Sequence, residues 1–340
     1  MTKTKRKFLS EFGINLCSAR WLLMPATQLS SDGTISKDDE DISKNCHIYL
    51  ICERPAISFD KSSFLYEDGK ICGRIIYKID GIENHESFSV EFPLLDEAVE
   101  LRLSKYPHRE IQTFDKDGEC VRFLPASAIS VGHSPHTTNH IFRKLKVLYV
   151  GQAFGNGSRT ARDRLKNHGT LQKILADASY TSPDSEIFVL TVEYEPYRLI
   201  ASFDGISKKA VNDNRDSARF VSILENPLRV REQISIAEAA LIRYFQPHYN
   251  QIYKKKFPST DLKILGKCYE YDFSALFVEI NTDELGLSLH SDTAPPKMHH
   301  IVNIDLVDQE SRASFFHFPG DNGQQIRFMP SIGSTDNQGD

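Results

Sequence analysis

Hydrophobic runs alternate with polar turns along the first part of the chain, and this pattern predicts strands. Apolar runs over residues 47–53 and 70–80 are separated by Asp-Gly turn signals. One segment, residues 94–106 ("LLDEAVELRLSKY"), has the spacing of a helix instead. We therefore predict an α+β domain of unknown role over residues 1–127.

The pattern changes after residue 128, where strand-like and helical segments alternate. Strands are predicted at "KVLYVG" and "EIFVLTVEY", and helices from about Thr160 and within "SIAEAALIRYF". This alternation predicts a small α/β unit over residues 128–258. Residues 259–340 are predicted to form a small β-rich region that ends in a disordered tail, because the last residues are small and polar.

Composition narrows the class of protein. No apolar run reaches the roughly 18 residues of a membrane span, and no signal peptide is recognisable. The six cysteines are scattered without metal-ligand spacing. We expect a cytoplasmic protein with reduced thiols and no membrane partner.

The net charge of −5 argues against a protein that coats nucleic acid, but the charge is unevenly distributed. Residues 141–175 hold eight basic side chains and one acidic side chain, a local balance of 8 − 1 = +7. This basic segment contains the stretch "VLYVGQAFGNGSRTARDRLKNH", in which a strand, a glycine-rich turn and an arginine-rich helix follow one another. The turn lacks the Gly-Lys-Ser/Thr ending of a P-loop.

Two polar residues of this predicted helix stand out. With a start at Thr160, helical spacing places Arg164 and His168 on the same face as Leu165. A guanidinium buried on such a face needs an anionic partner, which is either a structural carboxylate or a bound phosphate. A third alternative is that this edge of the helix is simply exposed to solvent. The residues alone leave these alternatives open.

Glu238 is the corresponding candidate in the later helix, because it lies close to an apolar stripe and carboxylate oxygens are ligands for Mg²⁺. Ser235 and Glu238 also have the spacing of a capping box, in which the glutamate only reaches back to the start of the helix. The residues alone leave this alternative open too.

Together these segments resemble the GIY-YIG nuclease superfamily, which includes homing and restriction endonucleases. The resemblance covers roughly residues 128–258. The family's second half motif, a Tyr-Ile/Val-Gly strand end, matches Tyr149, Val150 and Gly151. Its helical arginine matches Arg164, and a histidine present in some branches matches His168. Its metal-binding glutamate and its closing asparagine match Glu238 and Asn250.

The resemblance implies an α+β fold with a central, mostly antiparallel sheet flanked by helices, and an endonuclease that hydrolyses DNA with bound Mg²⁺ or Mn²⁺. Tyr149, Arg164, His168, Glu238 and Asn250 would be the catalytic residues, with Glu238 holding the metal. DNA contacts are expected from basic residues near the motif: Arg143, Lys144, Arg159, Arg162, Lys254, Lys255 and Lys256. Restriction of, or defence against, foreign DNA is the expected process, by analogy with nucleases whose catalytic domain carries large flanking segments. The oligomeric state is left open, with a homodimer as one alternative.

One element of the family pattern is missing at its usual place. The first half motif, Gly-Ile-Tyr, is expected about ten residues before Tyr149, where the nearest match is His140, Ile141 and Phe142. Either His140 takes the place of the tyrosine, or the first strand lies further upstream, or the site is impaired. The third alternative predicts a nucleic-acid-binding module on the same fold. An interaction protein is expected instead if Tyr149, Arg164 and Glu238 do not converge in one cleft.

Overall fold

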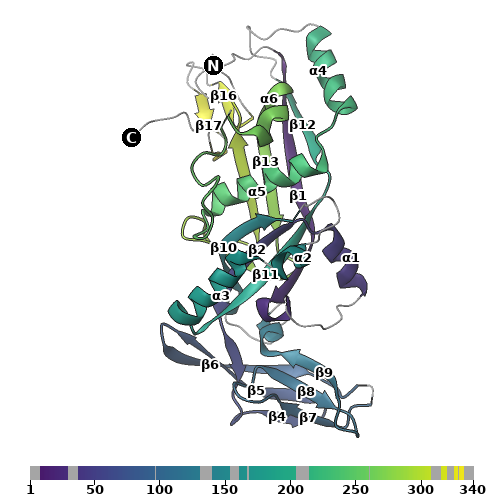
Figure 1. Cartoon of the computed structure of the whole chain (residues 1–340), viewed down its shortest axis with the longest axis vertical. Coiled ribbons are helices and arrows are strands. Elements are labelled where there is room, and N and C mark those ends of the chain that lie inside the picture. The colour runs from purple at the N-terminus through teal and green to yellow at the C-terminus, as the bar shows by residue number, and fades with distance from the viewer. Residues whose placement is uncertain are drawn as a thin grey trace.

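The computed structural model describes residues 8–29, 37–95, 97–130, 140–153, 161–166, 168–203, 214–259, 261–307, 315–319, 325–327 and 329–332. Over these residues the chain is a mixed α/β protein in which sheets predominate (Figure 1). The mixed α/β class predicted from the sequence is confirmed.

A single large sheet forms the body of the protein. In the described part of the chain it has eight strands in the order β14-β10-β2-β11-β1-β13-β15, with β12 paired to β1. Most neighbouring strands are antiparallel, and the sheet curls until it is nearly closed, like a barrel. The strands are β1 (Ser10–Pro25), β2 (Ile48–Pro55), β10 (Lys144–Gln152), β11 (Ser185–Tyr194), β12 (Arg198–Phe203), β13 (Phe273–Asn281), β14 (Ser288–His290) and β15 (His299–Asp305).

Helix α5 (Val230–Phe245) fills the concave face of this sheet. Its buried residues lie on almost every side of the helix, because the curled sheet surrounds it. Ile48, Leu50 and Val150 point toward the helix from β2 and β10. Burial of these apolar side chains is the main contribution that holds α5 against the sheet.

The convex face carries a second core under α3 (Gly169–Thr181), α2 (Ala161–Lys166) and the 3₁₀ turn η1 (Ala26–Leu29). Leu165, Leu171 and Ile174 from the two helices pack on it. Because side chains alternate along a strand, β2 sends Tyr49 and Ile51 to this face and Ile48 and Leu50 to the other.

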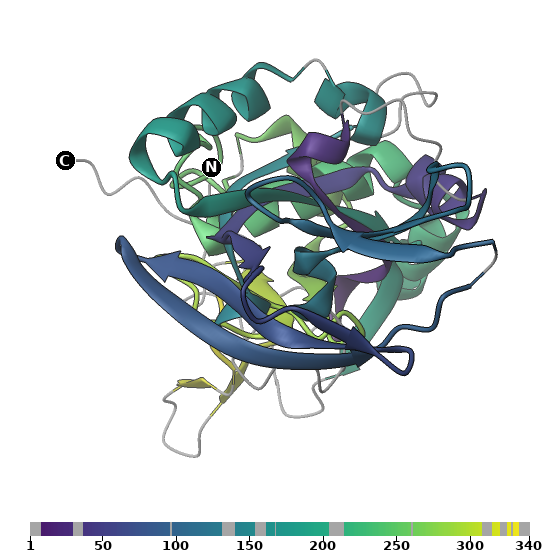
Figure 2. The same ribbon diagram turned by 90° about the horizontal axis from the view of Figure 1, so that it is seen from below.

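A separate lobe, residues 57–125, is inserted between β2 and β10 and lies at one end of the body (Figure 1). It has two small sheets, which Figure 2 shows as distinct layers, with an apolar core between them. The strands are β3 (Ile57–Phe59), β4 (Leu65–Glu67), β5 (Lys70–Ile79), β6 (Ile82–Glu91), β7 (Glu100–Leu103), β8 (Glu110–Phe114) and β9 (Cys120–Pro125).

The buried guanidinium of Arg54 fastens the lobe to the body. Its Nη1 donates to the carbonyl of Phe142 at 2.8 Å and its Nη2 to the carbonyl of Ser127 at 3.0 Å. The same group lies over the ring of Phe188 in the body, 4.4 Å from the ring centre. These contacts hold the segments that follow the lobe against β2.

The remaining elements lie around these layers. They are α1 (Lys37–Asn45), η2 (Ala126–Ser130), η3 (His140–Arg143), α4 (Asn214–Glu225), η4 (Lys263–Leu265), α6 (Gly266–Glu270), β16 (His317–Pro319) and β17 (Gln325–Arg327).

Several sequence predictions can be compared with this fold. The sheet takes strands from all three predicted segments, and the part that stands apart is the lobe. The predicted helix over residues 94–106 is wrong, because Glu100–Leu103 is strand β7 and its leucines alternate with polar residues. The tail from residue 333 lies outside the described residues. None of the described helices is long and apolar enough to cross a membrane.

Candidate active site

Two tyrosines lie side by side on the convex face of the β2/β10 strand pair. The register aligns Tyr49 with Gly151 and Tyr149 with Ile51, so the two side chains are diagonal neighbours. Their ring centres are 6.1 Å apart. Tyr49 is fully buried and Tyr149 is partly buried. The antiparallel pairing of these strands therefore creates a pair of phenol groups.

Tyr49 was not among the residues selected from the sequence, which left three alternatives for the first half motif: His140 in place of the tyrosine, a first strand further upstream, or an impaired site. Phe142, in the nearest match, is fully buried in the core of the lobe, with its ring 4.6 Å from that of Tyr77. The side chain of His140 lies outside the described residues. Tyr49 follows Ile48 on β2, the strand paired with the one that carries Tyr149, and His47 stands where the Gly-Ile-Tyr pattern has its glycine. The Ile-Tyr pair in "HIYLICE" was the available signal, and the inserted lobe hid it.

Gly151 is necessary for the close approach of the two phenols. A Cβ at this position would lie 2.6 Å from Cζ and from the hydroxyl of Tyr49, and 2.8 Å from Cε1 of Tyr149. Such distances are well inside van der Waals contact, so any side chain would displace a tyrosine. Glycine here makes room for Tyr49.

A β-bulge orients Tyr149. The register between β10 and β2 shifts between Val147 and Tyr149, which leaves Leu148 as the extra residue. The turn after α5 binds this irregular edge, because the amide of Tyr249 donates to the carbonyl of Leu148 at 3.1 Å. Bulges commonly redirect a side chain beside a functional site.

Asn250 completes this contact. Its Oδ1 accepts from the amide of Val150 at 2.9 Å and its Nδ2 donates to the carbonyl of the same residue at 2.8 Å. Asn250 is 6% exposed, and both ends of its amide are occupied. Asn250 was expected to be a catalytic residue, and in the structure its hydrogen bonds hold the strand that carries Tyr149.

His168 lies against both tyrosines, but not for the reason deduced from helical spacing. Helix α2 ends at Lys166, and His168 is the N-cap of the next helix, α3, so it does not share a helix face with Arg164. Its Nδ1 accepts from the amide of Leu171 at 3.3 Å. Thr160, the expected helix start, lies outside the described residues.

This cap determines where the proton of the imidazole resides. A nitrogen that accepts a hydrogen bond carries no proton, so neutral His168 is protonated on Nε2. Nε2 lies 3.1 Å from the hydroxyl of Tyr49 and donates to it. Burial and then the charge of Arg164 lower the pKa of His168, which favours the neutral form.

The hydrogen-bond chain continues from Tyr49 to Tyr149. The hydroxyl of Tyr49 donates to that of Tyr149, and this contact lowers the pKa of Tyr149 against the larger raising effect of burial. The chain therefore runs from His168 through Tyr49 to Tyr149.

Arg164 is exposed on α2, while its neighbour Leu165 is fully buried. The expectation that helical spacing presses Arg164 against the sheet is therefore wrong. Its guanidinium instead hydrogen bonds to Tyr49. Burial is the largest influence on the pKa of Tyr49, Tyr149 and Glu238 and raises all three, and the charge of Arg164 lowers each of them. A single cation thus acts on all three groups.

Glu238 approaches from α5 at the end of β10. Its Oε2 accepts from Nε2 of Gln152 at 2.8 Å. Burial raises its pKa to about 7, and the opposing influences of Arg164 and Gln152 are smaller. The carboxylate is therefore held in a site that does not stabilise its charge fully.

The alternative explanation of Glu238 as a capping residue is wrong. Helix α5 begins at Val230, and the glutamate that reaches back to its start is Glu232, whose Oε2 accepts from the amide of Arg229 at 2.7 Å. Glu238 lies in the interior of the helix. Its position needs another explanation.

A divalent cation fits this donor. Hard cations such as Mg²⁺ prefer carboxylate oxygen and often take only one or two ligands from the protein. Among the described residues, Gln152 is the only side chain that donates a hydrogen bond to the Glu238 carboxylate, and no group of three metal-ligating side chains is found. Glu238 would thus be the single protein carboxylate at the cation, with substrate and water supplying the other oxygens.

Tyr253 is a further neighbour of Glu238 that the sequence analysis did not single out. Burial raises its pKa, and the charge of Glu238 raises it further. Its backbone has φ of 68°, a left-handed conformation that is uncommon for an aromatic residue. Tyr253 directly precedes the basic run Lys254–Lys256, so it places that run next to the candidate site.

The expected DNA-binding residues are not gathered in one place. Lys255 and Lys256 are exposed beside Tyr253, and the carbonyl of Lys254 is held by Nη1 of Arg243 at 2.5 Å. Arg143 and Lys144 lie at the start of β10, whose length of nine residues corresponds to about 26 Å. Arg159 and the side chain of Arg162 lie outside the described residues.

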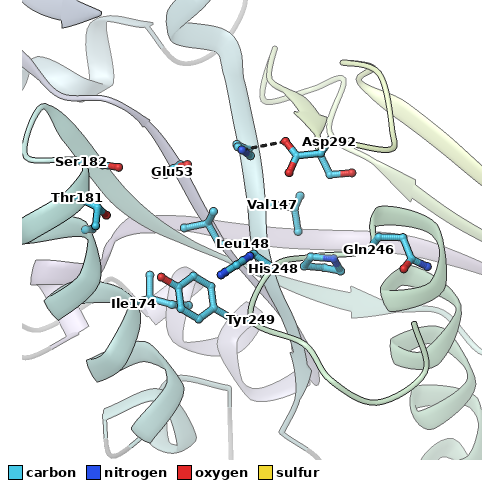
Figure 3. Close-up of a pocket in the computed structure, with 14 residues that line it drawn as sticks. Glu53, Val147, Leu148, Ile174, Thr181, Ser182, Gln246, His248, Tyr249 and Asp292 are labelled. Atoms are coloured by element: carbon cyan, nitrogen blue, oxygen red, sulfur yellow. Dashed lines mark ion pairs between the residues drawn. The ribbon is translucent and has the colours of Figure 1, made fainter. Parts of the chain in front are cut away.

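Two cavities lie away from the tyrosines. One, of about 240 Å³, lies near the C-terminal end of α3 and is lined by Glu53, His248, Tyr249 and Asp292 among others (Figure 3). In its wall Nζ of Lys146 pairs with Asp292 at 3.0 Å. A larger cavity of about 580 Å³ lies between the lobe and the body and is lined in part by Lys144. Neither is lined by a predicted catalytic residue.

Comparison of the chain with protein-family models, with curated proteins and with solved structures found no match. The functional argument therefore depends on the geometry of the site.

Proposed function

We propose that this chain is a metal-dependent endonuclease that hydrolyses DNA phosphodiester bonds, with a site of the GIY-YIG type. The observation that supports it is the convergence of Tyr49, Tyr149, Arg164, His168 and Glu238 at the end of one strand pair. These residues come from two strands and three helices. Their order along the chain and the second tyrosine agree with the resemblance noted in the sequence.

The chemistry assigned to each group follows from its contacts. A divalent cation held by Glu238 would polarise the scissile phosphate and stabilise the leaving 3′ oxygen. Arg164 is exposed and carries a fixed fork of donors, so it can bind the phosphate oxygens as negative charge develops on them.

The tyrosines would position the attacking water. Tyr149 is the outer member of the hydrogen-bond chain, and its hydroxyl would orient the water. The proton of the water would leave to solvent or to a phosphate oxygen, because burial raises the pKa of Tyr149 and keeps the phenol protonated. Tyr49 supports Tyr149 by donating to its hydroxyl. His168 cannot accept a proton on Nε2 in the observed arrangement, because Nδ1 is already an acceptor. We assign His168 the role of holding Tyr49 in place.

DNA would contact the body next to Arg164 and the exposed lysines that follow Tyr253. Exposed basic side chains contribute affinity that is independent of sequence and sensitive to salt. Because the net charge of the whole chain is negative, attraction of DNA would depend on this local concentration of basic residues.

The competing proposal of an impaired nucleic-acid-binding module was motivated by the missing first tyrosine. Tyr49 is a candidate for that tyrosine, because it lies beside Tyr149 with its hydroxyl in the hydrogen-bond chain, and this supports an active nuclease. Glu238 and Arg164 both act on the pKa of Tyr149, and this proximity supports a nuclease over an interaction protein.

The test is cleavage of a supercoiled plasmid with Mg²⁺ by the full chain and by the variants Arg164→Ala and Glu238→Ala. We expect cleavage by the wild type and a loss of about 100- to 1000-fold in each variant, the range found when a transition-state contact is removed. Arg102→Ala and Glu91→Ala, exposed positions in the lobe, are the matched controls. Cleavage that both site variants retain would reject the proposal.

A further inference from the structure

We propose that Gln152 is a positioning residue for Glu238, and that its hydrogen bond to Oε2 fixes the orientation in which the carboxylate meets a divalent cation. This inference rests on the proposed function, because it concerns the cation that the nuclease reaction would use. Gln152 belongs to neither half motif and was not among the residues selected from the sequence.

Gln152 has the contacts that such a role needs. It is the last residue of β10 and follows Gly151 directly. Its Nε2 donates to Oε2 of Glu238 at 2.8 Å, and its Oε1 lies 3.4 Å from the hydroxyl of Ser235, which donates to it. Since Ser235 occupies the oxygen end of the amide, the NH₂ end faces Glu238.

The chemical nature of the donor matters. A lysine or arginine in this place would neutralise the carboxylate and compete with a cation for it. A neutral amide orients the carboxylate and preserves its negative charge. Glu238 and Ser235 are three residues apart on α5 and therefore lie on one side of the helix, so both reach the same glutamine.

The same hydrogen bond fixes how far the Glu238 carboxylate on α5 lies from the tyrosine on β10. Tyr149 and Gln152 are on one strand, whereas Glu238 is on the helix that packs against its concave face. The Gln152–Glu238 hydrogen bond joins these two elements at the point where the tyrosines and the carboxylate meet. Partners that orient a ligand in this way typically contribute 10- to 100-fold to metal affinity.

The experiment is a titration of the metal-free full chain with Mn²⁺, followed by electron paramagnetic resonance of the free ion. The proteins are the wild type, Glu238→Ala, Gln152→Leu, Gln152→Glu and the control Gln172→Leu, which changes an exposed glutamine of α3. Leucine keeps approximate size and removes the donor. Glutamate also removes the donor but adds a possible ligand.

We expect Mn²⁺ binding that Glu238→Ala abolishes and that Gln152→Leu weakens by about 10- to 100-fold. Gln152→Glu should bind at least as tightly as the wild type, because a carboxylate would then lie next to Glu238. The Gln172→Leu control should be unchanged. Thermal unfolding of each variant without metal shows whether it is folded.

Two results would overturn the inference alone. In the first, Gln152→Leu binds Mn²⁺ within about twofold of the wild type while Glu238→Ala does not bind. In the second, Gln152→Leu and Gln152→Glu lose affinity equally and lose thermal stability in parallel, as expected of a purely structural link between strand and helix. If Glu238→Ala binds like the wild type, the cation site of the proposed function fails together with this inference.

Discussion

The fold shifts the pKa values of two carboxylates, Asp60 in the lobe and Glu238 in the candidate site, in opposite directions. In the lobe, Asp60 accepts from the amide and hydroxyl of Ser62 at 2.9 and 2.6 Å, and from Nε and Nη2 of Arg74 at 3.0 and 2.6 Å. The Ser62 hydroxyl, followed by other hydrogen bonds that include those of Arg74, holds the pKa of Asp60 below its usual range.

Glu238 in the body has one side-chain hydrogen-bond partner in the described part of the chain, Gln152, and burial raises its pKa to about 7. The lobe thus satisfies its carboxylate and gains stability, whereas the site leaves its carboxylate partly unsatisfied. An incompletely satisfied charge in a folded protein is a common feature of functional sites. The comparison distinguishes a structural acid from a candidate ligand without reference to any relative.

The largest expected effect is the loss of DNA cleavage when the Tyr49 hydroxyl is removed. Replacing Tyr49 by Phe removes the hydroxyl that links His168 to Tyr149, and we expect plasmid cleavage with Mg²⁺ to fall by about 100-fold or more. Tyr66→Phe makes the same change in the lobe and should leave the cleavage rate of the folded protein unchanged. Equal rates for Tyr49→Phe and the wild type would show that the buried tyrosine has no part in the reaction.

The next effect is on stability, and its sign should differ between the two carboxylates. Folding raises the pKa of Glu238 from 4.5 to about 7, so its charged form is disfavoured in the native state. Stability is then highest below about pH 4.5 and falls until about pH 7. The gap corresponds to up to about 3 kcal/mol. Without metal, Glu238→Gln should therefore stabilise the protein at pH 8 and change little at pH 4.

Asp60→Asn should do the reverse. Because folding lowers the pKa of Asp60 below its ordinary 3.8, its contribution is present above that pH and is lost as the pH falls. The variant should destabilise the protein at pH 8. Thermal unfolding in the presence of a chelator measures both. Destabilisation of similar size by the two variants at pH 8 would show that the two carboxylates contribute to stability in the same way.

The smallest effect is expected at two glycines, one in each region. A Cβ on Gly151 would lie 2.6 Å from Tyr49 ring atoms, whereas a Cβ on Gly73 of the lobe would first meet the carbonyl oxygen of Ser63 at 3.2 Å. We expect Gly151→Ala to cost about 1–3 kcal/mol of stability, the usual range for overpacking, and to impair cleavage. Gly73→Ala should cost less and leave cleavage unchanged.

Unfolding in denaturant and cleavage assays on both glycine variants measure these effects. A Gly151→Ala protein with the stability and activity of the wild type would mean that the tyrosines have room to move.

The sequence predicted the strands, the helix and several candidate residues of the site, but the argument from helical spacing did not explain how these residues come to lie there. The apolar runs located β10, β11 and α5, and the spacing along the chain selected Arg164, His168 and Glu238 as candidates. The shared helix face of Arg164 and His168 was wrong, since a break after Lys166 makes His168 a helix cap. Periodicity describes one continuous helix and cannot detect that a second helix begins within the same pattern.

Tyr49 and Gln152 show a different limit. Tyr49 lies before the lobe in the sequence and Tyr149 after it, and only the pairing of β2 with β10 brings them together. Gln152 looks like any polar residue at the end of a strand until Ser235 and Glu238 lie beside it.

By itself the sequence determined which residues could carry chemistry, because the side chains and their alternation along strands are local properties. Only the tertiary structure decided which of them meet. Strand pairing joins residues at any separation along the chain, and burial sets the charge state of Glu238 through surroundings contributed by distant segments.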